Sequence, residues 1–266
     1  MENLKITVFQ GYLFWENIDK NLQNIALRLQ GGLREKTDLI ILPEMFNTGF
    51  SMDAARLAEP MGGKTMQWMT DIAAKYACVI TGSFIVAEGG KYYNRLIWMR
   101  PDGTYEHYDK RHLFAMGKEH LTYTAGSKKL ITELKGWKVC PMICYDLRFP
   151  VWMRNVDAAY DLLLIVANWP EKRALHWRTL LPARAVENQA YVIGVNRVGH
   201  DGNEVYHSGD STCVSPNGDV VYYRRDEEDL YTFSISADEL KRVRRAMPFL
   251  KDADRFEIDE AVLRVE

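Results

Sequence analysis

Short apolar runs alternate with amphipathic stretches along most of this chain, a pattern that predicts strands interleaved with helices. Residues 4–10, LKITVFQ, alternate apolar and polar positions as a half-buried strand does, and residues 37–44, TDLIILPE, have the composition of a buried strand. Between them, residues 17–32 have helical spacing and end on two glycines, which commonly stop a helix. The chain is therefore predicted to begin with a strand, a helix and a second strand.

The same alternation continues to residue 236, with hairpins mixed in. Residues 65–77 have helical spacing, residues 78–88 are typical of a strand, and two glycines then turn the chain into another strand over 91–100. The remaining predicted strands are 136–144, 161–169, 191–198, two within 211–225 around Pro-Asn-Gly, and 230–236. A helix is predicted over 174–190, and Pro182 is expected to kink or restart it.

This order of elements predicts an α/β protein with a mixed sheet. Strands that alternate with helices favour parallel pairing, whereas the hairpins add antiparallel pairs. So many strands suit a sandwich of two sheets with helices outside. Inspection of the sequence finds no low-complexity linker and no internal repeat, so we predict one domain over residues 1–266.

The composition is that of an ordinary globular protein and does not favour non-specific binding to nucleic acid. Hydrophobic residues make up 47% of the 266 residues, charged residues make up 26%, and the formal net charge is −2. The most basic stretch, KRVRRA at 241–246, follows acidic residues and is interpreted as the solvated face of a helix. We therefore expect no nucleic-acid partner.

The sequence also bears on location. The N-terminus, MENLKITVFQ, lacks a basic region followed by an apolar core, and no apolar run reaches the roughly 20 residues that a membrane span needs. The four cysteines are Cys78, Cys140, Cys144 and Cys213, and they show no zinc-site spacing. We expect a cytoplasmic protein with reduced thiols and no membrane partner.

Three polar residues follow predicted strands directly and are the candidates for chemistry. Glu44 ends ILPE, Lys110 lies in YEHYDKRHLF, and Cys144 ends VCPMIC. Each alone admits a plain structural interpretation, as a turn residue, a solvated lysine or a buried thiol. However, sites in layered α/β folds gather at the carboxyl ends of strands, so the three side chains are candidates to converge.

These stretches, together with VANWP, ARAVENQAYVIGVNRVG and HSGDSTCVSPNGDV, resemble the nitrilase superfamily of carbon–nitrogen hydrolases. DKRHLFAMGKEHLTYTAG, CYDLRFPVWMRN and VANWPEKRALHW are similar to its bacterial omega-amidase branch, the 2-oxoglutaramate amidases. Many relatives carry Glu where this chain has Val151, which favours that branch. The resemblance implies a four-layer α-β-β-α sandwich that pairs into a homodimer or a larger homo-oligomer.

The resemblance also assigns roles to the residues. Cys144 would attack the amide carbonyl to form a thioester, with Glu44 as general base. Lys110 and the backbone N–H of Tyr145 would stabilise the oxyanion. Glu119, in GKEHL, would orient Lys110 and the substrate or water, although a pairing with Lys118 or a helix end is the alternative. No metal and no organic cofactor are expected.

The implied substrate is a small keto-amide, 2-oxoglutaramate and also 2-oxosuccinamate, formed where glutamine donates its amino group, including to the keto acid of methionine salvage. Its carboxylate needs a cationic seat, for which Arg148 and Arg173 are candidates. Arg148 could instead pair with Asp146, and Arg173 could be an exposed helix-start residue. Phe46, Phe114, Tyr123 and Trp169 are candidates for apolar pocket walls, with ordinary core packing as the alternative.

One rival mechanism and two rival functions stay open at this stage. A Cys–His pair could use Cys144 with His112 or His120, but it would leave Glu44 and Lys110 unexplained. A nitrilase would act on nitriles in place of amides. A non-catalytic binding protein on the same scaffold would not need the Glu, Lys and Cys set.

Overall fold

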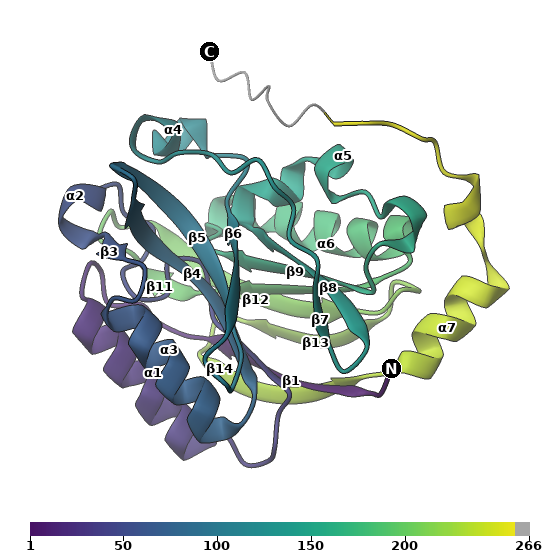
Figure 1. The fold of residues 1–266 in the computed structure, drawn as a ribbon, viewed down its shortest axis with the longest axis horizontal. Coiled ribbons are helices and arrows are strands. Elements are labelled where there is room, and N and C mark those ends of the chain that lie inside the picture. Colours follow the sequence, from purple (N-terminus) through teal and green to yellow (C-terminus); the bar gives the residue numbers. More distant parts are fainter. Residues whose placement is uncertain (259–266) are drawn as a thin grey trace.

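The computed structural model describes residues 1–258 and contains two stacked seven-stranded sheets (Figure 1). The first sheet has the order β14-β1-β2-β4-β5-β6, with β3 beside β4. The second has the order β11-β12-β10-β9-β8-β7, with β13 beside β12. Parallel pairs such as β1–β2 and β8–β9 coexist with antiparallel pairs such as β4–β5, so the prediction of mixed pairing is confirmed.

The strand bounds follow. The first sheet consists of β1 (Leu4–Gln10), β2 (Leu39–Ile41), β3 (Glu59–Pro60), β4 (Val79–Glu88), β5 (Lys91–Met99), β6 (Tyr105–Asp109) and β14 (Asp229–Ile235). The second consists of β7 (Thr132–Leu134), β8 (Trp137–Ile143), β9 (Leu162–Ala167), β10 (Tyr191–Asn196), β11 (Val198–His200), β12 (Tyr206–Val214) and β13 (Val220–Arg225).

Helices cover the outer faces of both sheets and complete four α-β-β-α layers. The helices are α1 (Ile18–Gly32), α2 (Ala54–Leu57), α3 (Lys64–Tyr76), α4 (Glu119–Thr122), α5 (Pro150–Met153), α6 (Ala174–Asn188) and α7 (Ala237–Ala246). Figure 1 shows α1 and α3 side by side on the outer face of the first sheet, with α6 on the opposite side. No helix within residues 1–258 is long and apolar enough to cross a membrane.

Apolar burial holds these layers together. On α1, the residues Leu22, Ile25 and Leu29 recur at helical spacing and pack under the first sheet. Burying one such side chain contributes about 1.5–3 kcal/mol. On the second sheet, α6 approaches β10 so closely that a Cβ added at Gly194 would lie 2.6 Å from the side chains of Leu181 and Trp177. Any larger residue at this position would force the helix away from the sheet.

Most predicted elements are confirmed within a few residues, and the differences have local causes. The strand predicted over 37–44 is only Leu39–Ile41, because Pro43 has no N–H for a ladder bond and the chain turns at Glu44. The helix predicted to kink or restart at Pro182 is one continuous helix, so the restart is wrong. Trp177, Leu181 and Ala185 on its buried face anchor it on both sides of the proline.

The basic stretch at 241–246 lies on α7, as predicted, but one of its arginines is not solvated. Arg244 donates to Asp161 Oδ1 at 2.6 Å and to the carbonyl oxygens of Tyr160 and Gln189. It therefore ties α7 to the second sheet. Residues 259–266 lie outside the described part, and the single domain over 1–266 stays a prediction.

Strand ends from both sheets meet at one place. Glu44 follows β2 and Lys110 follows β6 in the first sheet, whereas Cys144 follows β8 and Asn168 follows β9 in the second. The parallel pairing of β8 with β9 places their carboxyl ends at one edge. The stacking of the two sheets therefore brings polar residues from distant parts of the chain together.

Candidate active site

A buried cluster of three charged side chains forms the base of the site. Lys110 Nζ donates to Glu44 Oε1 at 2.8 Å and to Glu119 Oε1 and Oε2 at 3.0 and 2.9 Å. Glu44 and Glu119 are 0% exposed and Lys110 is 1% exposed. The alternative pairing of Glu119 with Lys118 is therefore wrong, and the interpretation of Lys110 as a solvated lysine is wrong as well.

Neutral donors also form hydrogen bonds with the two carboxylates. Asn94 Nδ2 donates to Glu44 Oε1 at 2.8 Å and to Glu119 Oε1 at 3.1 Å. The backbone N–H of Phe114 donates to Glu119 Oε2 at 2.6 Å. The backbone N–H of Asn168 donates to Glu44 Oε2 at 2.8 Å. Each oxygen of the two carboxylates thus has a partner, which a buried charge requires.

The cluster carries one positive and two negative charges, so its electrostatics are coupled. Burial lowers the pKa of Lys110, but the charges on Glu119 and Glu44 outweigh it and hold that pKa above its usual value. Burial raises the pKa of Glu119, the Lys110 charge opposes this rise, and the Glu44 charge adds to it. Lys110 is therefore protonated at neutral pH and is the only cation in contact with the two carboxylates among the described residues.

Replacing Lys110 with methionine is therefore expected to destabilise the fold. Removing one partner of a buried ion pair typically costs about 3–5 kcal/mol. It also removes the charge that opposes the raised pKa of Glu119, so that pKa moves further up. A carboxyl whose folded pKa is raised loses stability as pH rises through that pKa. Denaturant unfolding should show a larger deficit at pH 8 than at pH 5.

A surface lysine provides the matched control for this substitution. Lys64 pairs with Asp19, and the side chains of both are well exposed. Exposed pairs contribute little, so Lys64→Met should change the free energy of unfolding by less than about 1 kcal/mol. Equal stability of Lys110→Met and the parent protein would contradict the assignment of a buried, charged cluster.

Cys144 is presented on a strained turn at the end of β8. Its φ is +43°, a left-handed conformation that is costly for a residue with a Cβ. The turn is held by Asp146, whose carboxylate accepts from the backbone N–H of Ile143 at 3.0 Å, from Tyr108 Oη at 2.8 Å and from the backbone N–H of His112 at 3.0 Å. Asp146 is 0% exposed, and its hydrogen bonds hold the backbone of the turn in this strained conformation.

The thiol is neutral in the resting protein. Burial and the charge on Glu44 raise the pKa of the Cys144 thiol well above its usual value, although the charge on Lys110 opposes them. A nucleophilic role for this thiol would therefore require a base to take its proton. The N–H of Tyr145, in the first turn of the 3₁₀ segment Cys144–Arg148, has no intrahelical partner.

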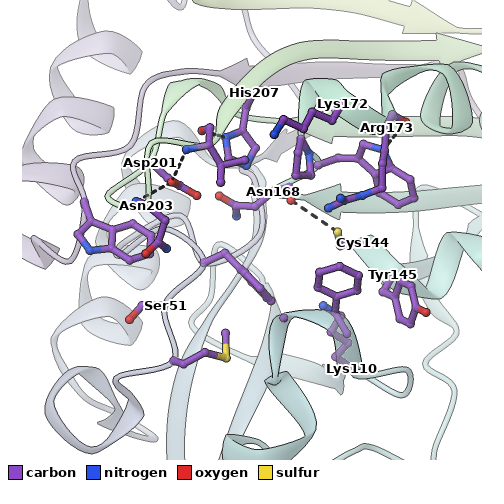
Figure 2. Close-up of a pocket in the computed structure, with 18 of the residues that line it drawn as sticks. Ser51, Lys110, Cys144, Tyr145, Asn168, Lys172, Arg173, Asp201, Asn203 and His207 are labelled. Carbon is purple, nitrogen blue, oxygen red and sulfur yellow. Dashed lines mark hydrogen bonds between the residues drawn. The ribbon is translucent and has the colours of Figure 1, made fainter.

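A cavity of about 570 Å³ opens above Lys110 and Cys144 (Figure 2). Its other walls include four residues that the sequence analysis assigned to substrate binding, namely Phe114, Arg148, Trp169 and Arg173, together with Tyr145 and Asn168. Glu44 and Glu119 do not line it and lie behind Lys110. In Figure 2, Asp201, Asn203 and His207 lie on the side of the cavity away from Tyr145.

The two candidate arginines both line this cavity but contact different side chains. Arg148 lies 4.7 Å from the ring centre of Trp169 and contacts His176 Nδ1 at 3.1 Å. Its expected alternative pairing with Asp146 is wrong, because Asp146 holds the turn as described above. Arg173 lies 5.3 Å from the ring centre of Phe114, and burial lowers its pKa. Arg173 is therefore not the freely exposed helix-start residue of the alternative interpretation.

Several other candidates do not reach the cavity. Phe46 packs in the core under the first sheet, and Tyr123 packs in a separate cluster, where its hydroxyl donates to the carbonyl of Ser51. His112 contacts Asp146 Oδ1 at 2.8 Å and stacks on Phe149. Neither His112 nor His120 lines the cavity with Cys144, which removes the basis for a Cys–His pair.

Asn94 and Asn168 belong to the site but were not predicted from the sequence, and Asp146 does not have the partner that was expected for it. Asn94 lies in the middle of β5, where a single polar residue gives no signal of its inward contacts. Asn168 follows β9 in VANWP, and its position directly after a buried strand was a signal that could have found it. Asp146 follows Cys144 by two residues and was considered only as a partner for Arg148. Within residues 1–258, no group of three or more His, Cys, Asp or Glu could hold a metal ion.

Comparisons with known proteins agree with this geometry. The carbon–nitrogen hydrolase family model matches residues 5–245. Omega-amidase YafV of Escherichia coli K12 is 43% identical over 259 residues, which cover 97% of this chain and 100% of that protein. A 2-oxoglutaramate amidase of Bacillus subtilis is 34% identical over 219 residues, which cover 81% of this chain and 84% of that protein.

Solved structures show the same architecture. XC1258 from Xanthomonas campestris, a CN-hydrolase superfamily protein with an arsenic adduct in its active site, superposes with a TM-score of 0.95 at 42% identity, covering 97% of this chain and 100% of that one. Nit3 of Saccharomyces cerevisiae, a nitrilase superfamily member, superposes with a TM-score of 0.85 at 26% identity, covering 93% and 95%. The chain therefore belongs to the carbon–nitrogen hydrolase family of the nitrilase superfamily.

Proposed function

We propose that this protein is an omega-amidase that hydrolyses the terminal amide of 2-oxoglutaramate, and also of 2-oxosuccinamate, to the 2-oxo dicarboxylate and ammonia. The observation that carries this proposal is the buried Glu44–Lys110–Glu119 cluster beside Cys144 at the floor of a cavity with a cationic wall. The names of two relatives, which match 97% and 81% of this chain, support the substrate class.

In the first half of the reaction, Cys144 Sγ attacks the amide carbon while Glu44 takes the thiol proton. The carbonyl oxygen becomes an oxyanion, which Lys110 and the N–H of Tyr145 stabilise. Glu119 keeps Lys110 charged and oriented. The C–N bond then breaks as Glu44 returns the proton to the nitrogen, so ammonia leaves and the acyl group remains on sulfur as a thioester.

In the second half, water attacks the thioester carbon and Glu44 takes a proton from it. The second tetrahedral intermediate collapses by breaking the C–S bond. The carboxylic acid is released, and the proton held by Glu44 restores the Cys144 thiol. Every step uses protein groups and water, so we expect no need for a metal or an organic cofactor.

An ammonia-release assay over four compounds tests this proposal. We expect the highest kcat/KM for 2-oxoglutaramate, with much lower values for glutamine, asparagine and a nitrile. Preferred release of ammonia from the nitrile would identify a nitrilase. Absence of turnover for all amides, with the Cys144 thiol intact by mass spectrometry, would point to a non-catalytic binding protein.

The cationic wall of the cavity predicts selectivity for the distal carboxylate. Replacing that carboxylate with a neutral methyl ester is expected to lower kcat/KM by roughly 10³-fold, because a guanidinium that the bound substrate shields from water is then left unpaired. Arg148→Ala and Arg173→Ala identify the arginine that binds the carboxylate. The variant that lacks this arginine no longer discriminates between the acid and its neutral analogue.

Lys172 lines the same wall and supplies the matched control. Lys172→Ala should keep most of the discrimination, because Lys172 is exposed and its charge is screened by water. If the Arg148 and Arg173 variants both discriminate between the acid and its neutral analogue as well as the parent protein does, neither arginine binds the carboxylate.

The biological setting belongs to the same proposal. We propose a cytoplasmic homodimer, or a larger homo-oligomer, that removes the keto-amide left after glutamine donates its amino group, as in methionine salvage. Free, reduced Cys78, Cys140 and Cys213 suit such a compartment. Mass measurement in solution and fractionation of cells would test the assembly and the location.

A further inference from the structure

Asn168 carries a buried hydrogen-bond acceptor that has no protein partner. Its side chain amide is anchored because Nδ2 donates to the carbonyl oxygen of Glu44. This bond fixes the orientation of the amide, so that the opposite atom is Oδ1. Oδ1 is buried and has no partner among the described residues. The residue as a whole is 6% exposed. An acceptor in this state costs free energy unless a ligand or water supplies a donor.

This acceptor lies beside the groups that carry the proposed reaction. The backbone N–H of Asn168 donates to Glu44 Oε2 at 2.8 Å, and its carbonyl oxygen lies 4.0 Å from Cys144 Sγ. Asn168 also lines the cavity with Cys144 and Lys110, as Figure 2 shows. One residue therefore contacts Glu44, lies next to the Cys144 thiol and carries an unpartnered acceptor.

Other buried polar atoms without a partner do not share this position. Asn94 Oδ1 also has no partner, but Asn94 is 0% exposed and does not line the cavity. Within residues 1–258, Asn168 is the only residue that both lines this cavity and has such an atom. Its unpartnered acceptor therefore lies in the cavity wall, within the residue layer that a bound substrate would contact.

We propose that Asn168 Oδ1 accepts a hydrogen bond from the carboxamide N–H of the substrate and thereby selects amides over esters. This inference rests on the proposed amide hydrolysis at Cys144. The substrate's NH2 group has two donors, and no carbonyl or ester oxygen has any. An ester bound in the same place would leave Oδ1 unpaired. Its alkoxy oxygen would lie against Oδ1, so that two acceptors would be in contact.

The hydrogen bond also has a mechanistic consequence. When Cys144 attacks, the amide nitrogen changes from planar to pyramidal and gains a localised lone pair. A bond from one N–H to Asn168 Oδ1 limits rotation about the C–N bond, which helps to direct that lone pair toward Glu44. Glu44 can then protonate the nitrogen before it leaves. Asn168 would thus position the leaving group by direct contact.

The test compares an amide and the methyl ester of the same acid in one series of variants. Asn168→Ala removes the acceptor and the anchor on Glu44 together. Loss of the anchor affects both substrates, because both need Glu44 to activate Cys144. Loss of the acceptor removes a hydrogen bond of the amide, whereas for the ester it removes an unfavourable contact between two oxygen atoms. We expect kcat/KM for the amide to fall about 10- to 100-fold further than kcat/KM for the ester.

Two further variants separate the acceptor from the anchor. Asn94→Ala removes donors to Glu44 and Glu119 but no cavity acceptor, so both substrates should lose activity by the same factor. Asn168→Asp keeps an acceptor and loses the donor, so its rates should fall while the ratio of amide to ester kcat/KM stays near that of the parent protein. Because a ratio does not depend on the amount of folded enzyme, partial unfolding does not obscure the result.

The outcomes are distinct. An equal loss for amide and ester in Asn168→Ala would overturn the inference and leave Asn168 as a support for Glu44. A collapse of the ratio in Asn168→Asp would overturn it as well, even if Asn168→Ala failed to fold. Turnover of neither substrate by the parent protein would overturn the proposed function itself, and this inference with it.

Discussion

Replacement of Cys144 by alanine is expected to abolish amide hydrolysis, with kcat reduced by about 10⁴-fold or more. The thiol is the group that forms the proposed thioester, and no other described cysteine lines the cavity. The change removes one sulfur atom from a partly exposed side chain, so the fold should persist. Ammonia release and thermal unfolding measured on the same sample check both statements.

Cys140 provides the matched control, because it lies in β8 four residues before Cys144 and is fully buried away from the cavity. Cys140→Ala should lose some stability through the space left in the core but should retain kcat. Intact-mass measurement under turnover should detect an acyl adduct on the parent protein and on the Cys140 variant only. Substantial activity in Cys144→Ala would exclude Cys144 as the nucleophile.

Glu44→Gln is expected to lower kcat by about 10²–10⁴-fold, the usual contribution of a general acid–base group. Glutamine keeps the shape of the side chain and the hydrogen bond that Lys110 donates at 2.8 Å. It cannot take the proton from a thiol whose pKa is raised well above its usual value. Both the formation and the hydrolysis of the thioester should therefore slow, with little change in KM.

Single-turnover kinetics would measure the two half-reactions separately. Glu59 supplies a control carboxylate, since it is 9% exposed, bonds to Thr65 and Asn47, and does not line the cavity. Glu59→Gln should leave kcat nearly unchanged. If Glu44→Gln instead raised KM alone, Glu44 would be a binding residue and another group would have to activate Cys144.

The strand-end candidates could be found without coordinates because their signal is local. Glu44 and Cys144 each follow an apolar run directly, and such runs predict buried strands whatever the rest of the fold is. A polar residue at that point lies at a sheet edge by necessity. Lys110 and Glu119 had weaker local signals, and their assignment depended on the resemblance to a family.

The misjudged contacts have a different cause. Arg148 and Asp146 are two residues apart, which made a pair plausible, yet the carboxylate of Asp146 is occupied by partners from β6 and the following loop. Asn94 looks like any polar residue within a strand. Whether such a residue points to solvent or into a buried cluster depends on which sheet stacks on its own, and the alternation along one strand does not contain that information.

The sequence alone determined the elements, their order and the chemical types available at the strand ends, because hydrophobic periodicity and turn chemistry act over a few residues. The tertiary structure decided which of those polar groups meet. Glu44, Asn94 and Lys110 come from the first sheet, whereas Cys144 and Asn168 come from the second. Only the stacking of the two sheets brings these groups together. The burial that follows gives Lys110 two carboxylate partners and leaves Asn168 Oδ1 buried without a protein partner.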